Sequence, residues 1–470
     1  MKNSRESHRC DGNFAAVRIG ETNSKGRGLF SRCALAAGDT ALVERPLAGM
    51  QSLDNAQDVM VCRNCLGFIG DVILQLELLY GVPRHECLWR LEARMDSDAR
   101  VTVFSRVVEC RQGCGEVYCS EKCREEHFDR CHSLLCVGPI PVEEAPSHPL
   151  VGFRVHAAQT NEIFLLVGEV VARIVSDHAV SGRDIADAEA PFKDFVQEAW
   201  WDVVVARDDG LRSHKGATVA SQKAEALPQT LQKLCSESSS YLYRALAPPS
   251  PLKDLNGVLS THRFGTVIGM FEQNNVGIRV PSPIPVALEA LLADVGDTEE
   301  SVLVEVARLI RSIEGYEEDS ESEACFSEES DSSDCAAGKR DANSGDPDEV
   351  DEGEISTDHA RTILENSLGN SFAPLDGTAL YTLICAMNHS CRPNCVVKYA
   401  GRGDRSMSGK ADALAAHVML LENVDEGVEL TQSYINNDMS LKERRKALEE
   451  YGFHCMCSLC LEESSKGDTS

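Results

Sequence analysis

The sequence lacks three features, and each absence excludes a class of protein. Its 470 residues include no apolar run of the roughly 18 residues that a membrane-spanning helix needs. The first residues, MKNSRESHRCDGNF, lack the apolar core of a secretory signal. Positive charge is scarce: 46 Lys and Arg stand against 75 Asp and Glu, and the net charge of −29 argues against a general nucleic-acid-binding surface. We therefore expect a protein of the nucleus and/or cytoplasm, with neither a membrane nor a nucleic acid as its direct partner.

Cysteine, by contrast, is abundant, with 20 residues. In a reducing compartment this number indicates metal binding rather than disulfide bonds. Between residues 62 and 136, Cys and His residues form four closely spaced pairs, and each such pair can bind one zinc ion without backbone strain. We expect two zinc ions with interleaved ligands, each held by one early and one late pair. The expected ligands are Cys62, Cys65, Cys110, Cys114, Cys119, Cys123, His132 and Cys136.

The last ligand pair leaves alternatives open. His132 and Cys136 have the usual spacing of a zinc-binding pair. Cys131, which is adjacent to His132, and His127 are two other residues that could take the place of His132. Because such a module cannot fill a core of its own, zinc should supply much of its folding energy.

A third group of thiols lies near the C-terminus, where the stretch CMCSLC contains Cys455, Cys457 and Cys460. Three thiolates are one ligand short of a closed structural zinc site. The other polar, thiol-bearing turn in this half of the chain is NHSCRPNC, residues 388–395. We expect Cys391 of this turn to be the fourth ligand, with Cys395 as the alternative. A shared zinc ion would hold the tail over the turn.

Local patterns predict strands, helices and one acidic insertion. Residues 20–44 have the glycine turns and short apolar runs of β-strands. Residues 162–175 and 286–295 have the apolar spacing of helices. Residues 314–358 contain 18 Asp and Glu but only one Lys and one Arg. Their apolar residues are too few to offset the entropy cost of ordering, which predicts a disordered insertion.

Five segments, in this order, resemble the SET-domain protein lysine methyltransferases. The similarity is to the branch whose SET domain is interrupted by a MYND-type zinc module. Because the sequence ends soon after Cys460, it is most similar to the short fifth animal member of the SET-and-MYND group or to a plant trithorax-related SET protein. The matching segments are SKGRGLF (24–30), the cysteine-rich stretch 62–136, NHSCRPN (388–394), ELTQSY (429–434) and YGFHCMCSLC (451–460). Two details depart from the family pattern: the third zinc-binding pair is C-x3-C, and His132 lies one residue later than usual.

The resemblance implies an α+β fold. In it, a β-rich SET domain is interrupted by a MYND-type zinc module and a helical insert, and is closed by a post-SET zinc tail. The expected boundaries are 13–55 for the N-terminal SET strands, 60–138 for the zinc module, 149–313 for the mostly helical insert with a cofactor-side segment near 264–280, 314–360 for the acidic insertion, 370–436 for the core SET domain and 437–464 for the zinc tail.

The resemblance also implies that the protein transfers a methyl group from S-adenosylmethionine to lysine amines of histones and/or other basic proteins. In such a transfer the protein must hold the amine in line, keep it neutral and exclude water. The implied cofactors are S-adenosylmethionine and three zinc ions, and an acidic surface suits basic substrates.

The resemblance assigns roles to individual residues. Tyr434 and Tyr451 are the implied catalytic residues. The implied cofactor-binding residues are Lys25, Gly26, Arg27, Gly28, Asn274 (with Asn275 as the alternative), Asn388, His389, Tyr434 and Phe453. Glycines let the backbone approach the cofactor, the Asn388 amide and the His389 imidazole and backbone can donate or accept hydrogen bonds, and a flat Phe453 ring can stack on adenine.

A second hypothesis is a catalytically weak scaffold that binds partner proteins through its zinc module. MYND-type modules commonly bind proline-rich peptides, so the resemblance implies a possible peptide partner at this module. The complete NHSC motif together with Tyr434 and Phe453 favours an enzyme, because a decayed site should have lost one of them.

Overall fold

The computed structural model describes residues 16–94, 104–141, 143–179, 181–204, 222–246, 255–293, 300–322, 355–399, 414–449 and 451–467. These residues form a mixed fold of helices and short strands, as expected. Most of the expected acidic insertion, residues 323–354, lies outside the described residues.

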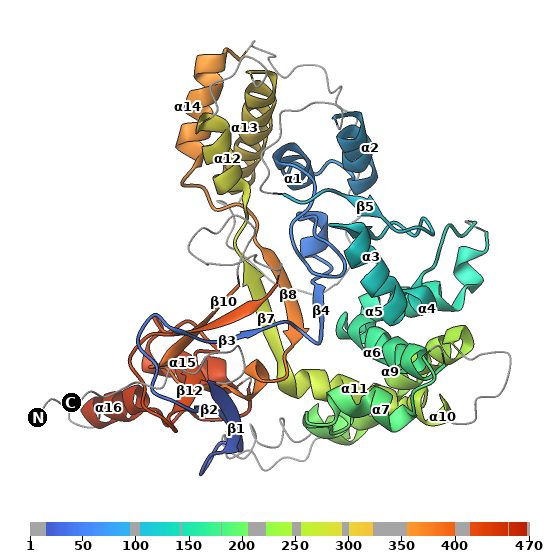
Figure 1. The fold of residues 1–470 in the computed structure, drawn as a ribbon, viewed down its shortest axis with the longest axis vertical. Helices are drawn as coiled ribbons and strands as arrows, with labels where there is room; N and C mark the ends of the chain where they lie inside the picture. Colours follow the sequence, from blue (N-terminus) through green and yellow to red (C-terminus); the bar gives the residue numbers. More distant parts are fainter. Residues whose placement is uncertain are drawn as a thin grey trace, which may run out of the picture.

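Strands from the two ends of the sequence pair with one another (Figure 1). One sheet has the order β1-β2-β12-β9. Its strands are β1 (Val17–Glu21), β2 (Arg27–Ser31), β12 (Glu429–Gln432) and β9 (Asn388–His389). The strand β9 runs parallel to β12, so it places Asn388 beside Thr431. The first and fourth matching sequence segments therefore meet in one sheet.

Two further sheets extend this β-rich body. The orders are β10-β11-β3 and β4-β8-β7, all antiparallel. The strands are β3 (Thr40–Glu44), β4 (Ala48–Gln51), β7 (Asn275–Val280), β8 (Leu375–Leu380), β10 (Cys395–Tyr399) and β11 (Ala416–Leu420). Their inward side chains, such as Leu42, Ala379 and Val418, are almost completely buried in one core. The three sheets bring residues 17–51 next to residues 375–432, and of the described residues between them only those of β7 belong to these sheets.

One group of helices packs around α6 (Ile163–Ala179), which confirms the helix expected over 162–175. Eleven of its 17 residues are buried, including the acidic Glu169. The other helices of this group are α5 (Pro149–Thr160), α7 (Ile185–Glu189), η4 (Ala190–Phe192), α9 (Gln222–Leu246), α10 (Leu255–Val258) and α11 (Thr261–Asn274). They lie at the lower right of Figure 1 and have an apolar core of their own.

A second group of helices lies at the top of Figure 1, apart from the first. Its members are α1 (Val72–Leu79), α2 (Arg84–Arg94), α12 (Ile284–Ala293), α13 (Glu300–Ser322) and α14 (Thr357–Ser367). The helix α12 confirms the one expected over 286–295, as far as the described residues reach. The helices α12 and α13 pack on α1 and α14, so the insert expected as one unit over 149–313 divides in space. The helix α13 also continues past the expected boundary at residue 313.

Short elements complete the fold. Besides α1 and α2, which pack in the second helix group, the cysteine-rich module of residues 60–138 contains β5 (Val108–Glu109), β6 (Val117–Tyr118), α3 (Glu121–His127), the π-helical turn η2 (Phe128–His132) and α4 (Ser133–Leu135). The remaining elements are η1 (Asn55–Gln57), η3 (Ala145–Ser147), η5 (Ile384–Ala386), α15 (Leu441–Glu449) and α16 (Ser458–Gly467). The helix α16 runs beyond the expected end of the zinc tail at residue 464. Within the described residues, no helix has the length and apolar character to cross a bilayer.

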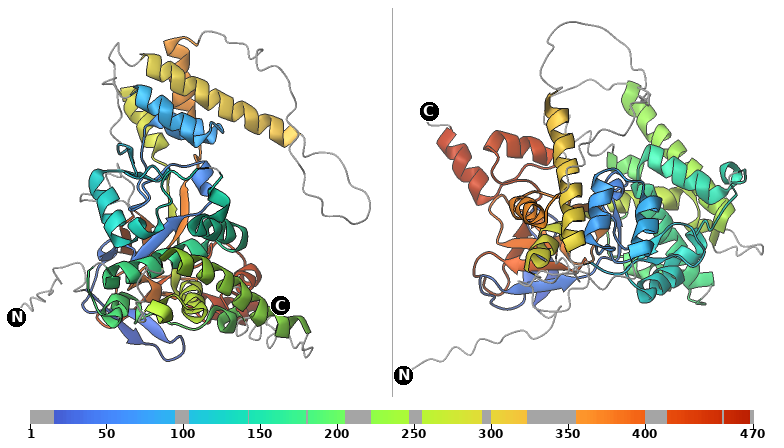
Figure 2. Two further views of the ribbon diagram at one scale, coloured as in Figure 1. Left: turned by 90° about the vertical axis from the view of Figure 1, so that its right-hand side faces the viewer. Right: turned by 90° about the horizontal axis from the view of Figure 1, so that it is seen from above.

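Two further views show how these parts are arranged around the β-rich body. Figure 2 shows α15 and α16 beside the β-rich body and the second helix group projecting away from it. The β-rich body thus carries the tail on one side, with the cysteine-rich module and the first helix group on the other.

Candidate active site and metal centres

The C-terminal tail meets the NHSC turn through four thiols. The Sγ atom of Cys391 lies 3.5 Å from that of Cys460 and 3.9 Å from that of Cys455. Cys457 completes the group, whose four sulfur atoms all lie within 4.8 Å of one another. The alternative ligand, Cys395, is instead buried in the core on β10 and belongs to no such group.

This thiol group fits zinc. Four sulfur donors at these separations match a closed tetrahedral structural site. Burial raises the pKa of the Cys457 thiol, but backbone N–H groups of Cys460 and Cys391 outweigh it and lower the pKa to about 6. A thiolate, which is the form that binds zinc, is therefore available near neutral pH.

The cysteine-rich module brings the eight expected ligands into two groups. Sγ of Cys119 lies 3.6 Å from that of Cys65 and 3.3 Å from that of Cys123. Nε2 of His132 lies 3.4 Å from the sulfurs of both Cys110 and Cys114. The groups are Cys62, Cys65, Cys119 and Cys123, and Cys110, Cys114, His132 and Cys136. They interleave as expected, each combining an early and a late pair, and both have donor sets that suit zinc.

The two residues considered in place of His132 lie together elsewhere. His127 and Cys131 are buried beside Glu169 of α6, with their possible ligand atoms within 4.8 Å of one another. Glu169 is ion-paired with Arg63, and Nδ1 of His127 is 3.0 Å from the hydroxyl of Tyr118. Because the carboxylate already has a cationic partner, we assign this group to an ion-pair network and not to a metal.

The Asn388 side chain is oriented by its neighbours. Its amide nitrogen donates to the backbone oxygen of Arg27 and to Oε1 of Glu429, both at 2.8 Å. Oε2 of Glu429 is 3.2 Å from Nζ of Lys25. Because both amide hydrogens are used, the carbonyl oxygen of Asn388 remains to accept a hydrogen bond from a ligand. Glu429, which the sequence assigned no role, therefore links two of the expected cofactor residues.

The His389 ring is committed within the protein. Its Nδ1 accepts a hydrogen bond from the backbone N–H of Tyr434 at 3.1 Å, and its Nε2 lies 3.2 Å from Sγ of Cys391. Burial, and then the charges of Lys25 and Arg444, lower the pKa of His389 to about 4. Both ring nitrogens thus have partners within the protein, and cofactor binding by His389 stays a prediction. The ring connects Tyr434 with a thiol of the tail.

Tyr434 and Tyr451 form an aromatic cluster with Phe453. The rings of Tyr434 and Tyr451 are 5.3 Å apart, and Phe453 meets Tyr434 edge-on at 6.4 Å. The Tyr434 hydroxyl donates to the backbone oxygen of Met387 at 2.6 Å. The Tyr451 hydroxyl donates to the backbone oxygen of Tyr434 at 3.3 Å. Both phenolic oxygens therefore retain lone pairs that can only accept.

The two tyrosines line a cavity of about 560 Å³. Its walls come from β7, from the segment around the NHSC turn and from the segment after β12. Tyr399 and Cys385 also line it, and sequence patterns gave no signal for either. Tyr399 is held by a hydrogen bond of 3.1 Å from its hydroxyl to the backbone oxygen of Gly277.

Gly26 and Gly28, in the segment from Lys25 to Gly28, are required for different reasons. Gly26 has a φ of +71° with open space at its Cβ position, as expected of a turn that a ligand can approach. At Gly28, an added Cβ would lie 2.8 Å from Cγ2 of Thr22 and 3.2 Å from Oε1 of Glu429. Gly28 therefore makes room for Thr22 and Glu429, and a role in admitting cofactor stays a prediction.

Arg27 and Asn274 bond to each other. Nη2 of Arg27 is 3.3 Å from Oδ1 of Asn274, and Nη1 of Arg27 contacts the backbone oxygen of Asp194. The Asn274 amide nitrogen donates to the backbone oxygens of Met270 and Val196. The Asn274 side chain is thus satisfied by the protein and joins β2 to the first helix group. This arrangement does not support direct cofactor binding by that side chain.

Glu44 is a further residue that the sequence did not reveal. Its buried carboxylate on β3 accepts hydrogen bonds of 3.0–3.1 Å from the backbone N–H groups of Leu383 and Ile384. Burial raises the pKa of Glu44 despite these bonds. The carboxylate fixes the turn η5, which leads directly into Met387 and Asn388.

Comparison with known proteins agrees with these observations. No protein-family model matches the chain. The chain is 26% identical over 517 residues to the histone-lysine N-methyltransferase ATXR2 of Arabidopsis thaliana, covering 98% of this chain and 92% of that protein. It is 21% identical over 459 residues to the protein-lysine N-trimethyltransferase SMYD5 of Gallus gallus, and the alignment covers 96% of this chain and 86% of that protein. It is 30% identical over 162 residues to SMYD5 of Danio rerio, and this alignment covers 32% of this chain and 36% of that protein.

The order of the sequence motifs, the grouped Cys and His side chains and these matches have the same explanation. They identify the SET-and-MYND protein lysine methyltransferases, of the plant trithorax-related or SMYD5-like kind, as the proteins that this chain resembles.

Proposed function

We propose that the protein uses S-adenosylmethionine to methylate lysine amines of histones and/or other basic proteins, by in-line transfer. One observation carries the proposal. Tyr434 and Tyr451 lie side by side on a cavity of about 560 Å³, and both hydroxyls have already donated their hydrogens to backbone oxygens. The names of the related proteins support lysine as the target group.

The residues around Asn388 fit the cofactor. The free carbonyl oxygen of Asn388 can accept from the ammonium group of an amino acid, and the turn at Gly26 leaves open space for a ligand. Phe453, half-buried beside His389, offers a flat face for adenine. When bound, S-adenosylmethionine supplies a methyl group that its sulfonium activates. We propose that Lys25, Gly26 and Arg27 contribute mainly through their backbone groups.

The tyrosines would orient the lysine amine. The hydroxyl hydrogen of Tyr434 is already hydrogen-bonded to the backbone oxygen of Met387, so the phenolic oxygen can only accept a further hydrogen bond. Tyr434 would therefore hold the amine by one of the amine's N–H groups. The lone pair of the amine then remains free to point along the transfer axis. This is catalysis by orientation, which can lower a barrier by several kcal/mol.

The site would also favour a neutral amine. Burial raises the pKa of Tyr434, so its hydroxyl stays protonated and presents no negative charge that would stabilise an ammonium group. Transfer of the lysine side chain from water into the cavity disfavours its charged form. Proton loss to solvent before transfer is therefore easier than in water, and no side-chain base is required.

We propose that zinc at the tail group keeps this arrangement in place. The His389 ring bonds on one side to the Tyr434 backbone and on the other to Cys391. Tyr451 and Phe453 lie just before Cys455 in the sequence, so the same group also positions the other two aromatic rings. Three zinc ions are proposed in total, one for this group and two for the cysteine-rich module.

The domain roles follow from these proposals. We assign residues 60–138 to the MYND-like module, the three sheets to the SET domain and residues 437–467 to the zinc tail. A nuclear and/or cytoplasmic location and a peptide partner at the MYND-like module also remain proposals. The scaffold hypothesis receives no support from the site, because the expected aromatic rings are all in place.

The test is transfer of labelled methyl from S-adenosylmethionine to core histones and to proteins of a cell lysate. The purified wild type should label at least one basic protein, and Tyr434→Phe should label little. Tyr243→Phe, an exposed tyrosine on α9, serves as the matched control and should behave as wild type. Equal labelling by wild type and Tyr434→Phe would remove Tyr434 from the mechanism.

A further inference from the structure

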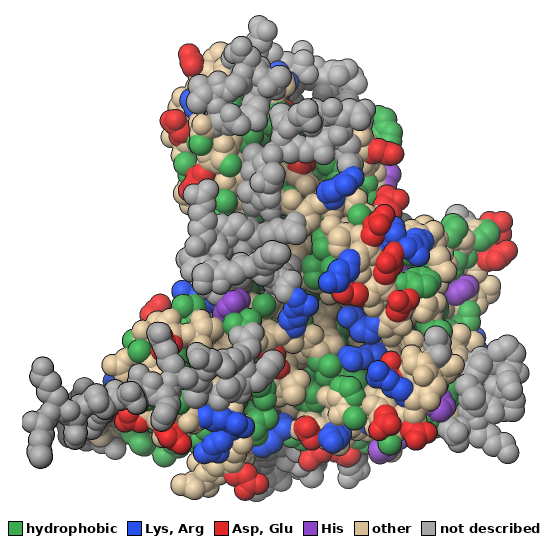
Figure 3. All heavy atoms as spheres, in the orientation of Figure 1, with side chains coloured by type: hydrophobic (Ala, Val, Ile, Leu, Met, Phe, Trp, Pro, Cys, Tyr) green, Lys and Arg blue, Asp and Glu red, His purple; other side chains and the backbone are tan. Residues whose placement is uncertain are grey.

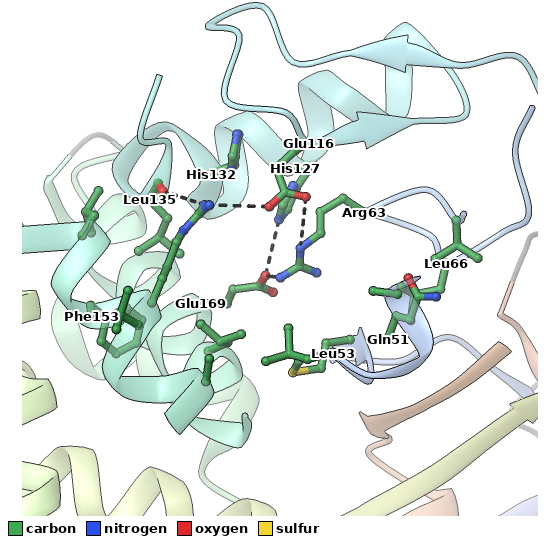
Figure 4. A pocket seen from close by; sticks show the side chains of 18 of the residues that line it. Gln51, Leu53, Arg63, Leu66, Glu116, His127, His132, Leu135, Phe153 and Glu169 are labelled. Carbon is green, nitrogen blue, oxygen red and sulfur yellow. Dashed lines mark hydrogen bonds and ion pairs between the residues drawn. The ribbon is translucent and has the colours of Figure 1, made fainter. Parts of the chain in front are cut away.

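Two cavities of the molecule differ in how their polar side chains are used. The first lies between the MYND-like module and the first helix group, and Figure 4 shows charged side chains from both sides facing one another. Arg63 is ion-paired with Glu169. Glu116 lies 3.8 Å from both Arg63 and Arg154. These pairs join the module to α5 and α6, which is a structural role.

The second, the methyl-transfer cavity, contains a buried amide that has no hydrogen-bond partner among the described residues. The side chain of Gln432 lines this cavity, and the residue is only 9% exposed. Its backbone oxygen accepts from the N–H group of Ser390 at 2.9 Å, whereas its side-chain amide bonds to no group of the described structure. Most buried polar groups in folded proteins are hydrogen-bonded, so this exception needs an explanation.

The position of Gln432 in its strand makes the amide unusual. Side chains alternate between the two faces of a strand, so Gln432 of β12 lies on the same face as Leu430, which is completely buried in the core. Thr431, on the other face, is held by hydrogen bonds to Asn394. The pattern favours an apolar residue at position 432, and a residue that breaks its local pattern is a candidate for a functional role.

The backbone fixes Gln432 beside the residues proposed for methyl transfer. Gln432 is paired with His389 where β12 and β9 run parallel. Tyr434 follows two residues later, its backbone N–H group bonds to the His389 ring, and its side chain lines the same cavity. The amide of Gln432 and the hydroxyl proposed to orient the amine are therefore carried by one short segment.

The cavity has room for more than the target lysine. Its volume of about 560 Å³ lies in the range of about 300–1,000 Å³ that is usual for a drug-sized ligand. In an extended peptide, the side chains two residues before and two residues after the lysine point the same way as the lysine. One of these two side chains would therefore enter the cavity together with it.

Charge does not determine which kind of side chain that is. Among the described residues that line the cavity, Glu272 is the one charged side chain, and it already interacts with another group of the protein. Figure 3 shows Lys and Arg side chains next to Asp and Glu side chains over the visible face, so this face carries no field of one sign. Selection inside the cavity then depends on hydrogen bonds.

A primary amide is complementary to another primary amide. Whichever way its end is turned, Gln432 presents one acceptor and one donor side by side. A carboxamide matches both, whereas a carboxylate only accepts and an ammonium or guanidinium group only donates. Asn437 lines the same cavity, and its Oδ1 accepts from Oγ of Ser433 at 2.7 Å, which leaves its amide hydrogens for a ligand. Water can satisfy these groups in the open cavity, so a side chain that displaces it must offer the same bonds.

We propose that the cavity also binds the substrate residue two positions from the target lysine, and that Gln432 selects a glutamine or asparagine there. The two amides would exchange two N–H···O bonds, and Asn437 would donate to the second lone pair of the substrate oxygen. This inference rests on the proposed function, because it takes the target lysine as the neighbour in the cavity. It narrows the substrates from basic proteins in general to segments in which a carboxamide lies two residues from a lysine.

The experiment compares side chains of similar shape and different hydrogen-bonding capacity. Short acetylated glycine peptides carry one central lysine and either glutamine, methionine or glutamate, placed two residues before or two residues after it. The full chain is assayed for kcat and KM of methyl transfer, and for peptide binding by calorimetry with S-adenosylhomocysteine present. At one of the two positions, glutamine should lower both KM and Kd about tenfold relative to methionine and glutamate. The kcat should not change, because Gln432 contacts the neighbouring residue and not the amine.

A variant of similar size tests the assigned amide. Gln432→Met should bring the KM values of the glutamine and methionine peptides to within about twofold of each other, because its side chain forms no amide bonds. It should not lower the unfolding temperature, since it removes a buried polar group that has no partner among the described residues. Gln232→Met, at an exposed glutamine of α9, is the matched control and should keep the preference of the wild type.

The outcomes separate this inference from the proposed function. Methyl transfer with equal KM for all three residues at both positions would overturn the inference and leave the proposed function standing. A binding preference for glutamine without any methyl transfer would do the reverse. The inference is also overturned if Gln432→Met keeps the preference, or if no peptide binds at about 5 mM.

Discussion

Replacing Cys455 with serine should release the C-terminal tail, because the four-thiol group forms most of the buried part of its apolar cluster. The apolar cluster of the tail has four fully buried members, three of which are the thiols Cys391, Cys455 and Cys460. The fourth, Leu448, is completely buried, which stabilises by only about 1.5–3 kcal/mol. A structural zinc ion contributes about 10–16 kcal/mol. Loss of one ligand should therefore unfold the tail locally while the three sheets remain folded.

Three measurements follow from this reasoning. Zinc content, determined by mass spectrometry on purified protein, should fall from three ions per chain to two. Amide hydrogen exchange should accelerate over residues 441–467 and stay slow in β2 and β11. Affinity for S-adenosylmethionine should fall, because Phe453 and the support of His389 by Cys391 are both lost.

The matched control is Cys395→Ser, which removes a buried thiol of the same half of the chain that lies outside the sulfur group. It should keep three zinc ions and slow exchange in the tail. The reasoning is refuted if Cys455→Ser keeps three zinc ions with unchanged exchange, or if Cys395→Ser is the variant that loses one.

Three further predictions concern the surroundings of the NHSC turn. Glu429→Gln should weaken cofactor binding roughly tenfold by calorimetry, because the Asn388 amide loses a charged acceptor, and the exposed Glu422→Gln should not. Gly28→Ala should lower both stability and cofactor affinity, since its Cβ would contact Oε1 of Glu429; an unfolding temperature equal to wild type would contradict this. The folded state raises the pKa of Glu44, so it binds a proton more readily than the unfolded chain, and stability should fall as the pH rises above about 4.5. Urea unfolding at several pH values should show a smaller fall for Glu44→Gln, and equal slopes would count against the assignment.

The sequence predicted well where several ligands had to meet one ion. The spacing of the Cys pairs predicted two interleaved groups, although not which late pair joins Cys62, and the missing fourth ligand of the tail pointed to Cys391. Spacing did not decide between His132, Cys131 and His127, because the π-helical turn η2 determines which of them faces the other thiols. Only the backbone conformation shows that His132 does so and that the other two face Glu169.

The sequence predicted poorly where function depends on contacts between distant segments. Glu44 bonds to Leu383 across 339 residues and Glu429 pairs with Lys25 across 404, and neither pair belongs to a local pattern. The same limit applies to His389: its ring nitrogens contact Tyr434 and Cys391, which a motif of adjacent residues does not reveal. Helical periodicity likewise identified α12 but not that it packs on α1, far from α6.

The most direct test of the central claim measures cofactor binding and methyl transfer on the same two proteins. Wild type and Tyr434→Phe are compared by calorimetry with S-adenosylmethionine and by transfer of its labelled methyl group to core histones and lysate proteins. Removing one hydroxyl that bonds to Met387 should cost about 1 kcal/mol of stability and leave cofactor affinity within a few fold. Transfer should fall about a hundredfold, because the amine loses its acceptor. Absence of cofactor binding in the wild type, or equal turnover in both proteins, would contradict the account.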